Sequence, residues 1–266
     1  MQFEYQSKTF NIEGVSKNDH IYKSIAQSGN FYEIDLLNYI YHIKPFIYSK
    51  KHKNIILDVG ANIGNHSIFF SSFISDHLIA IEPNSAVLPQ LRLNLSKNID
   101  NYTLYECGVG EKEGRGKMVV PENIDNNIGA ARIDLQSNDS DIEISTLDSV
   151  FAAWRKEEST PICVSVIKID VEGMEPQVLK GAENMIIEYK PHIFTEAATK
   201  KELKKIYNFL RPLNYRKLPG HWAATPVYHF AHNPPLSLVM IAYYMQVKRV
   251  IGKIKSRLTN KDMSRG

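Results

Sequence analysis

Two acidic residues and the glycine turn between them are the chemically most informative residues of this 266-residue chain. An apolar run ends at Asp58, the turn Gly60-Ala61-Asn62-Ile63-Gly64 follows, and the next apolar run ends at Glu82. An open parallel sheet builds a nucleoside pocket from such residues, because the carboxyl ends of its strands meet at one edge. The spacing therefore predicts a site for a ribose-containing cofactor.

The turn distinguishes two classes of cofactor. A dinucleotide-binding turn reads Gly-x-Gly-x-x-Gly so that the backbone can approach the pyrophosphate, and the middle glycine is missing here. S-adenosylmethionine has no phosphate and carries an amine and a carboxylate. We expect Asp58 to bind the amine, directly or through water, and the NH groups of Gly60–Gly64 to face the carboxylate. Glu82 would accept hydrogen bonds from the ribose hydroxyls.

A charged segment inside a later apolar run, Val166–Glu175, is the second informative region. Lys168 and Asp170 are two residues apart, so they share one face of the expected strand, about 6.6 Å apart along it. A charged pair in a buried strand is costly unless it is paired or used. We expect Lys168 and Glu175 to serve the structure, through ion pairs and a helix N-terminus, and Asp170 and Glu172 to belong to a site.

Methyl transfer to a hydroxyl is helped by a group that accepts the proton. The candidates for this base are Asp170, Glu172, Glu196 and His221. A carboxylate near its reference pKa of about 4 is a weak base, whereas histidine titrates near about 6.5. His221 precedes Trp222 in a loop that could contact a sugar, although an exposed histidine beside a packed tryptophan is the simpler interpretation. We expect His66 to cap or pack a helix.

We expect no metal site and no disulfide. The carboxylates of Asp170, Glu172 and Glu196 could bind a hard divalent cation, but no spacing in the sequence requires one. The two cysteines, Cys107 and Cys163, are too few for a disulfide framework or a zinc cluster. They indicate a reducing, intracellular setting.

The composition is that of a globular protein with a sizeable core, since 43% of the residues are hydrophobic. The N-terminus has no secretory signal pattern, and no apolar run approaches the roughly 20 residues that span a bilayer. Residues 234–266 carry seven Lys and Arg residues against one Asp, which leaves the preceding chain mildly acidic. An acidic body disfavours nucleic acid as a partner, and we expect a cytoplasmic protein.

The elements that must position these residues alternate between apolar runs and amphipathic segments, which predicts an α/β fold with a mostly parallel sheet. We divide the chain into a helical lead-in (1–52), a central domain (53–233) and a C-terminal helix (234–266). Residues 111–117 are expected to form a turn and 121–141 a long, functional loop. The expected strands are 54–59, 78–81, 103–107, 142–145, 164–171, 192–195, 215–217 and 227–230, and the main helices are 65–75, 84–98, 176–187 and 201–210.

The C-terminal segment has the pattern of a basic amphipathic helix. Its apolar residues recur at intervals of three and four: Met240, Tyr243, Tyr244, Val247, Ile251, Ile254 and Leu258. Its basic residues fall elsewhere on the helix: Lys248, Arg249, Lys253 and Lys255. Such a helix could lie on the inner face of an anionic membrane, form a homodimer, or pack against its own domain.

The chain resembles the FkbM-type family of S-adenosylmethionine-dependent methyltransferases over roughly residues 30–230. The resemblance rests on the segments Leu57–Asn65, Ile81-Glu82-Pro83, Thr146-Leu147-Asp148 and Ile167–Gly173, and on the trailing Glu175, Val178-Leu179, Gly181-Ala182 and Glu196. It implies the class I, Rossmann-like methyltransferase fold, a seven-stranded sheet with helices on both faces and its last strand antiparallel. It also implies that Tyr32-Glu33 matches a pair covering the cofactor, and that the acceptor is a hydroxyl of a sugar, a lipid-linked glycan or a secondary metabolite.

We therefore predict an S-adenosyl-L-methionine-dependent O-methyltransferase that acts on a sugar, glycan or other small hydroxylated metabolite and releases S-adenosyl-L-homocysteine. Two alternatives remain: a non-catalytic interaction module on the same fold, and a nicotinamide-dependent oxidoreductase, which the missing glycine disfavours. The residues expected to contact the cofactor are Tyr32, Glu33, Asp58, Gly60, Asn62, Gly64, Asn65, Ser67, Glu82 and Asp170.

Overall fold

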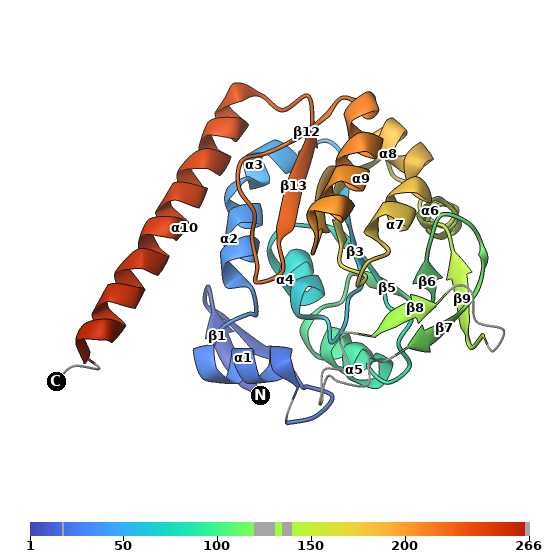
Figure 1. Ribbon diagram of the computed structural model, residues 1–266. Helices are drawn as coiled ribbons and strands as arrows, with labels where there is room; N and C mark the ends of the chain where they lie inside the picture. Colours follow the sequence, from blue (N-terminus) through green and yellow to red (C-terminus); the bar gives the residue numbers. More distant parts are fainter. Residues whose placement is uncertain (18, 120–130, 135–139, 264–266) are drawn as a thin grey trace.

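A mixed sheet with helices on both faces forms the centre of the molecule (Figure 1). The computed structural model describes residues 1–17, 19–119, 131–134 and 140–263. Within them, the strand order is β12-β13-β11-β10-β3-β4-β5, and β13 runs in the direction opposite to the other strands of this sheet. The strands are β3 (Lys53–Val59), β4 (His77–Ile81), β5 (Tyr102–Tyr105), β10 (Ile162–Ile169), β11 (His192–Glu196), β12 (Tyr215–Lys217) and β13 (Val227–His232). The expected α/β fold with a mostly parallel sheet is confirmed.

The apolar residues of β3 explain why both faces of the sheet are covered. Ile55, Leu57 and Val59 pack into one core, and Ile56 packs into the other. Burying each such side chain contributes roughly 1.5–3 kcal/mol. One core lies beneath α2 (Ile34–His42), α3 (Lys44–Ile47), α4 (Asn65–Phe73) and α5 (Leu88–Asn98), and the other beneath α6 (Leu147–Arg155), α7 (Glu175–Lys180), α8 (Glu183–Tyr189) and α9 (Lys200–Leu210).

The N-terminal lead-in is not purely helical. It opens with the hairpin β1 (Gln2–Tyr5) and β2 (Lys8–Asn11), followed by α1 (His20–Ser28). The backbone of Asn11 exchanges two hydrogen bonds with the side chain of Asn98, which fixes the hairpin to α5. The hairpin was not expected, because its turn residues Gln6 and Ser7 take the left-handed conformation that usually requires glycine or asparagine.

A small second sheet lies beside the main one, in the order β6-β9-β7-β8. Its strands are β6 (Gly108–Val109), β7 (Gly114–Val119), β8 (Arg132–Asp134) and β9 (Ile142–Ser145). The expected turn at 111–117 was therefore wrong, since β7 occupies its second half. Of the expected loop at 121–141, residues 121–130 and 135–139 lie outside the described part, and Arg132–Asp134 is a strand.

The helix expected at 176–187 is two helices, α7 and α8, separated at Gly181. The carbonyl of Gly181 accepts a hydrogen bond from Asp148 N at 2.8 Å. A Cβ atom at this position would lie 2.0 Å from the carbonyl oxygen of Gly110. Close packing against two other segments therefore interrupts the helix.

The C-terminal helix α10 (Leu236–Met263) follows a short 3-10 helix (Arg211–Leu213) and the last two strands, and it runs along the outside of the molecule (Figure 1). Leu238 and Ala242 are buried against the body. Among the helices of the described residues, none is long and apolar enough to cross a membrane.

Candidate active site

A pocket of about 300 Å³ opens at the carboxyl ends of β3, β4, β10 and β11. The segments after these strands form its floor. Asp19–Ile21 and Tyr32-Glu33 form one wall, and the loop before β13 contributes Ala224 and Thr225 to another. Met118, Ala131 and Ile133 of the small sheet region also line it. Segments far apart in the chain therefore meet at the edge of the sheet where open α/β proteins bind ligands.

Most of the predicted site residues line this pocket, and four do not. Those in its lining are Tyr32, Glu33, Gly60, Asn62, Asn65, Glu82, Asp170, Glu172 and Glu196. Those outside it are Asp58, Gly64, Ser67 and His221. We call the part formed by Gly60–Gly64 and Glu82 the turn side, and the part formed by Glu33, Asp170, Glu172 and Glu196 the carboxyl side.

The turn side begins with a backbone that only particular residues tolerate. Gly60 has φ +80°, and a Cβ atom on it would lie 1.8 Å from the carbonyl oxygen of Asp170. Asn62 also lies in the left-handed region, with φ +50°, a conformation that asparagine adopts more readily than most residues. Gly64, with φ +87°, precedes α4 as its N-cap. The turn thus bends the chain sharply from β3 into α4.

All five NH groups of the turn donate hydrogen bonds within the protein. The acceptors are Ile81 O for Gly60 and Ala61 (3.0 and 3.1 Å), Glu82 Oε2 for Asn62 (2.9 Å), Asn62 Oδ1 for Ile63 (2.8 Å) and Ala61 O for Gly64 (2.9 Å). The expectation that these groups face the carboxylate of a ligand was therefore wrong. The first NH groups of α4, which have no acceptor within their own helix, are the nearest remaining donors.

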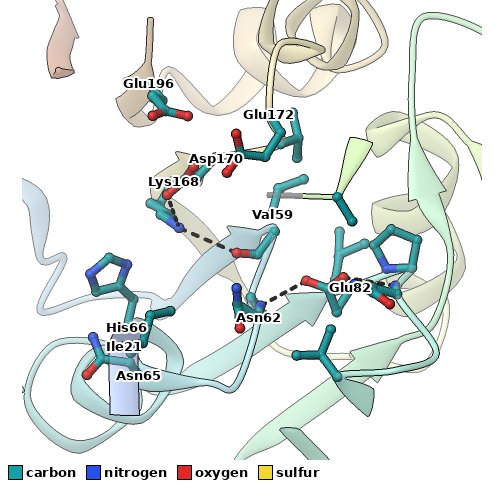
Figure 2. A pocket seen from close by; sticks show the side chains of 18 of the residues that line it. Ile21, Val59, Asn62, Asn65, His66, Glu82, Lys168, Asp170, Glu172 and Glu196 are labelled. Atoms are coloured by element: carbon teal, nitrogen blue, oxygen red, sulfur yellow. Dashed lines mark hydrogen bonds and ion pairs between the residues drawn. The ribbon is translucent and has the colours of Figure 1, made fainter. Parts of the chain in front are cut away.

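Glu82 is buried, and each oxygen of its carboxylate accepts a hydrogen bond from a backbone NH group (Figure 2). Oε2 accepts the hydrogen bond from Asn62 N, and Oε1 accepts one from Asn84 N, each at 2.9 Å. Burial raises its pKa, and the two backbone donors oppose that shift. A carboxylate has about four acceptor positions. Two bonds fix its orientation and leave a second lone pair on each oxygen for a ligand in the pocket.

Asp58 lies beneath the pocket rather than in its lining, which corrects the expected contact with an amine. Its side chain is fully buried, and Oδ2 accepts a hydrogen bond from Ser67 Oγ at 2.6 Å. Its Oδ1 makes no hydrogen bond within the described residues, but lies 3.5 Å from Lys168 Nζ. Asp58 and Ser67 therefore support Lys168 from below.

Lys168 joins the two sides of the pocket. Its Nζ lies 3.2 Å from Asp170 Oδ2 and 3.5 Å from the carbonyl oxygen of Gly60 (Figure 2). Burial lowers the pKa of Lys168, but Asp170 and Asp58 raise it more, so the amine remains charged. The ion-pair network agrees with the structural role expected for this lysine.

Asp170 and Glu196 form the centre of the carboxyl side. They follow residues paired between β10 and β11, Ile169 and Thr195, and their carboxyl groups share a hydrogen bond. Burial and the charge of Asp170 raise the pKa of Glu196 to about 9. Burial also raises the pKa of Asp170, but Lys168 and the bond from Glu196 bring it below its usual value. Glu196 therefore holds the shared proton at pH 7, and Asp170 is ionised.

Glu33 and His66 extend this cluster from the N-terminal side. Burial and Asp170 raise the pKa of Glu33 to about 7, whereas burial and Lys168 lower that of His66 to about 3. Nε2 of the neutral ring lies 3.4 Å from Glu33 Oε2 and makes no hydrogen bond within the described residues. The sequence interpretation missed His66 as a pocket residue. Its position in the first turn of α4, at the carboxyl edge of the sheet, was the available signal.

The lead-in is bonded directly to this part of the pocket. Asn65 Oδ1 accepts a hydrogen bond from Tyr32 N at 2.9 Å, and Asn65 Nδ2 donates to Tyr32 O at 3.0 Å. Glu33 takes a left-handed backbone conformation at the start of α2, with φ +55°. The segment 32–33 is therefore held in one position over the pocket.

Glu172 and Glu175 have different roles although they are three residues apart. Glu175 is buried, and its Oε1 accepts hydrogen bonds from Val171 N and Gly173 N. Those bonds close the turn after β10, in agreement with the expected structural role. Glu172 is exposed at the mouth of the pocket, where desolvation and Asp170 raise its pKa to about 7.

His221 is not positioned as a base, which corrects that candidate. Its side chain is exposed and outside the pocket lining, and its carbonyl accepts hydrogen bonds from Gln246 Nε2 and Arg249 in α10. Trp222 is buried and stacks on Tyr39 with ring centroids 4.4 Å apart. The structure thus contains the packed tryptophan that the simpler interpretation expected.

Within the described ranges, no group of three or more His, Cys, Asp and Glu side chains is arranged to hold a metal ion. The two cysteines are free thiols.

Comparison with known proteins places the chain in a family. The family model described as Methyltransferase FkbM domain matches residues 58–217. The chain is 21% identical over 164 residues to Methyltransferase 1 of Beauveria bassiana (strain ARSEF 2860), covering 54% of this chain and 63% of that protein. It therefore spans less than two thirds of the length of this curated relative.

Solved structures of similar fold include methyltransferase FkbM from Methylobacillus flagellatus KT, with a TM-score of 0.47, 22% identity, and coverage of 70% of this chain and 44% of that one. Another is SMU.1697c from Streptococcus mutans in complex with SAH, with a TM-score of 0.42, 15% identity, and coverage of 75% and 96%. The family model spans more than half of the chain, from Asp58 to the end of β12. The chain belongs to the FkbM methyltransferase family.

Proposed function

We propose that this protein transfers the methyl group of S-adenosyl-L-methionine to a hydroxyl group of a neutral sugar, glycan or other small hydroxylated molecule. The observation that carries the proposal is Glu82. Each of its two oxygens accepts one hydrogen bond from a backbone NH and has a second acceptor position, and the residue lines the pocket. Two adjacent ribose hydroxyls are the donors that such a pair of acceptors fits.

The turn itself argues against a dinucleotide. Asn62 stands where the middle glycine of a pyrophosphate loop would be, and its side chain accepts the hydrogen bond from Ile63 N. A phosphate would have to displace that side chain to reach the backbone. S-adenosylmethionine needs no such approach, and when bound it supplies a methyl group on a positively charged sulfur. Glu82 would hold its ribose, with the start of α4 facing its carboxylate end.

Asp170 is the residue we assign to the acceptor hydroxyl. It is ionised beside Lys168 and lies in the pocket lining, so it can accept a hydrogen bond from a hydroxyl and orient its oxygen. It can also take the proton as the methyl group is transferred. Glu196 keeps its own proton at pH 7 and therefore serves better as a donor to Asp170 or to the acceptor than as the base.

The charge of the pocket supports a neutral acceptor. Of the four carboxyl groups on its carboxyl side, Asp170 is ionised, Glu33 and Glu172 have pKa values of about 7, and Glu196 is protonated. Lys168, which is paired with Asp170, is the single Lys or Arg among the described residues that line the pocket. A phosphorylated or carboxylated acceptor would meet repulsion, whereas a polyhydroxylated one would find acceptors for its hydroxyls.

Two measurements test the proposal. Isothermal titration with S-adenosylhomocysteine should give binding that Glu82→Ala weakens about 100-fold, because two hydrogen bonds to a charged group are lost. Glu172→Ala, at the mouth of the carboxyl side, is the matched control and should bind normally. Unchanged affinity in Glu82→Ala would contradict the cofactor assignment.

Acceptor chemistry is tested separately with a methyl-labelled donor. We expect label to enter neutral glycans or glycosides and to be nearly absent from the corresponding sugar phosphates. Asp170→Asn should lower turnover more than it lowers affinity for S-adenosylhomocysteine. Tight cofactor binding without transfer to any hydroxylated acceptor would indicate a non-catalytic module.

A further inference from the structure

The outward face of α10 exposes a long run of apolar side chains. We call it the outer stripe, formed by Leu236, Met240, Tyr243, Tyr244, Val247, Val250, Ile251 and Ile254. These side chains are between 38% and 75% exposed. From Leu236 to Ile254 the stripe extends about 27 Å along the helix. Soluble surfaces rarely carry a contiguous apolar patch of this kind unless it contacts something.

The outer stripe is not the face by which α10 packs on its own domain, because the opposite side of the same helix already packs against the body. Leu238 and Ala242 are buried there. Gln246 packs closely on Gly220, since a Cβ atom added at Gly220 would lie 2.1 Å from Gln246 Cγ. Arg249 bonds to the carbonyls of His221 and Ala223 and lies 3.4 Å from Asp35. The helix is thus anchored on one side and apolar on the other.

Three Lys and Arg positions of the helix fall at the edges of the stripe. At 3.6 residues per turn, positions 248 and 255 fall beside Tyr244 at one edge and position 257 beside Val250 at the other, whereas position 253 falls on the line of Gln246. Each of these four positions is Lys or Arg, and the single acidic residue of the whole helix is Asp262. An apolar face between two basic edges is the arrangement of a helix that lies in a membrane interface, where Lys and Arg reach the lipid phosphates.

We propose that the outer stripe of α10 lies on an anionic lipid surface and holds the enzyme there as a peripheral membrane protein. Tyr243 and Tyr244 strengthen the case, because tyrosine places its ring among acyl chains and its hydroxyl among headgroups. The helix lies on the membrane and does not enter it as a span, since its basic edges keep it at the level of the headgroups.

Charge favours lipid over a second copy of this chain. Two α10 helices paired through their stripes would bring Lys and Arg edges against each other, with one Asp in each helix to offset them. An anionic bilayer instead gains from each basic residue near its surface. It also buries the full length of the stripe without requiring a complementary protein groove.

The contacts of Gln246 and Arg249 also connect the membrane-facing helix to the pocket. Gln246 and Arg249 hold the loop at His221 and Ala223, and the next residues, Ala224 and Thr225, line the pocket. A bilayer bound to the outer side of α10 would therefore lie at a fixed position relative to the acceptor. This inference rests on the exposed helix alone and stands even if the acceptor is not a sugar.

Co-sedimentation with lipid vesicles tests the proposal on the full-length protein. We expect binding to vesicles of phosphatidylcholine mixed with phosphatidylglycerol, and much weaker binding to phosphatidylcholine alone. Ile251→Glu should reduce binding at least about tenfold, because it places a charge in the stripe. Ile187→Glu in α8 is the matched control, since Ile187 is 51% exposed and Ile251 47%, and it should bind like the unchanged protein. Lys248→Gln should weaken binding about fivefold, on anionic vesicles only.

Three results would overturn the proposal. The first is equal vesicle binding by Ile251→Glu and the unchanged protein, and the second is equal binding to neutral and anionic vesicles. The third is a dimer in light scattering that Ile251→Glu dissociates while no vesicles are bound, which would identify a second copy as the occupant. Retained cofactor binding in Ile251→Glu excludes misfolding as the cause of a loss.

Discussion

The turn side and the carboxyl side of the pocket hold their polar groups in different ways. On the turn side, backbone NH groups fix Glu82, and the bend depends on the left-handed backbone of Gly60 and Asn62. On the carboxyl side, ionisable side chains hold one another: Lys168 pairs with Asp170, and Asp170 shares a proton with Glu196. The first arrangement is set by the backbone, whereas the second depends on which side chains are charged.

This difference indicates a division of labour. A site built from backbone NH groups suits a ligand that does not vary, because the fold sets the geometry of those groups. A cluster of coupled carboxyl groups can accept, donate or withhold a proton. The turn side is thus suited to the methyl donor and the carboxyl side to the acceptor. Three substitutions test how far the two sides are separate.

The largest effect is expected at Lys168, which joins them. Lys168→Met removes the cation from a buried network and leaves Asp58 and Asp170 without their partner. Breaking a buried ion pair in this way costs about 3–5 kcal/mol of unfolding free energy, measurable by urea denaturation. The double variant Asp58→Asn/Lys168→Met should recover part of that loss.

A surface ion pair gives the matched control for Lys168. Lys180 Nζ lies 2.9 Å from Glu111 Oε2, with side chains 50% and 44% exposed. Lys180→Met should change stability by less than about 0.5 kcal/mol. Similar losses in the two variants would mean that Lys168 does not link the two sides electrostatically.

The second effect concerns the contact between Gly60 and Asp170. Gly60→Ala adds a Cβ atom 1.8 Å from the Asp170 carbonyl oxygen, at a backbone φ of +80°. We expect a loss of about 2–4 kcal/mol by the same denaturation experiment. Gly29→Ala separates the two causes, because Gly29 has φ +61° but open space around it, and should cost only about 1–2 kcal/mol. Equal losses would show that the close contact is unimportant.

The smallest effect is in the pH dependence of stability. The pKa of Glu196 is raised from 4.5 to about 9 by folding, so the folded protein holds a proton that the unfolded chain releases in this range. Stability therefore falls as pH rises between these two values. Glu196→Gln lacks this proton, so between about pH 6 and 8 its unfolding free energy should gain about 2–3 kcal/mol relative to the unchanged protein. A constant difference across that range would mean that Glu196 is not protonated.

The turn side could be predicted from the sequence to a large extent, because it is local. Gly60, Gly64 and Glu82 lie directly after two strands, and each has the position that its residue type suggests. The hydrogen bonds of this side were predicted wrongly. The NH groups of the turn donate to acceptors within the protein, and the side chain of Asp58 is buried in the core of the sheet. The spacing of residues in a strand shows which side chains share a face of the sheet. Which of these side chains reach the ligand depends on how the surrounding segments pack.

The carboxyl side and the walls could be predicted only in part. Asp170 and Glu196 follow adjacent strands, so their proximity follows from the expected sheet order. His66 was missed and His221 was wrong, because the first depends on how α4 approaches the lead-in and the second on α10 covering its loop. The hairpin at Gln6-Ser7 and the break at Gly181 likewise depend on contacts with distant segments.

Two walls of the pocket come from outside the segment that defines the family. Residues 19–33 precede Asp58, and Ala224 and Thr225 follow the end of the matched region at residue 217. Insertions, deletions or substitutions in these flanks can reshape the space above the sheet while the strands beneath keep their register. The fold can in this way acquire new specificities from its two ends, and exchanging the flanks between relatives is the direct route to retargeting it.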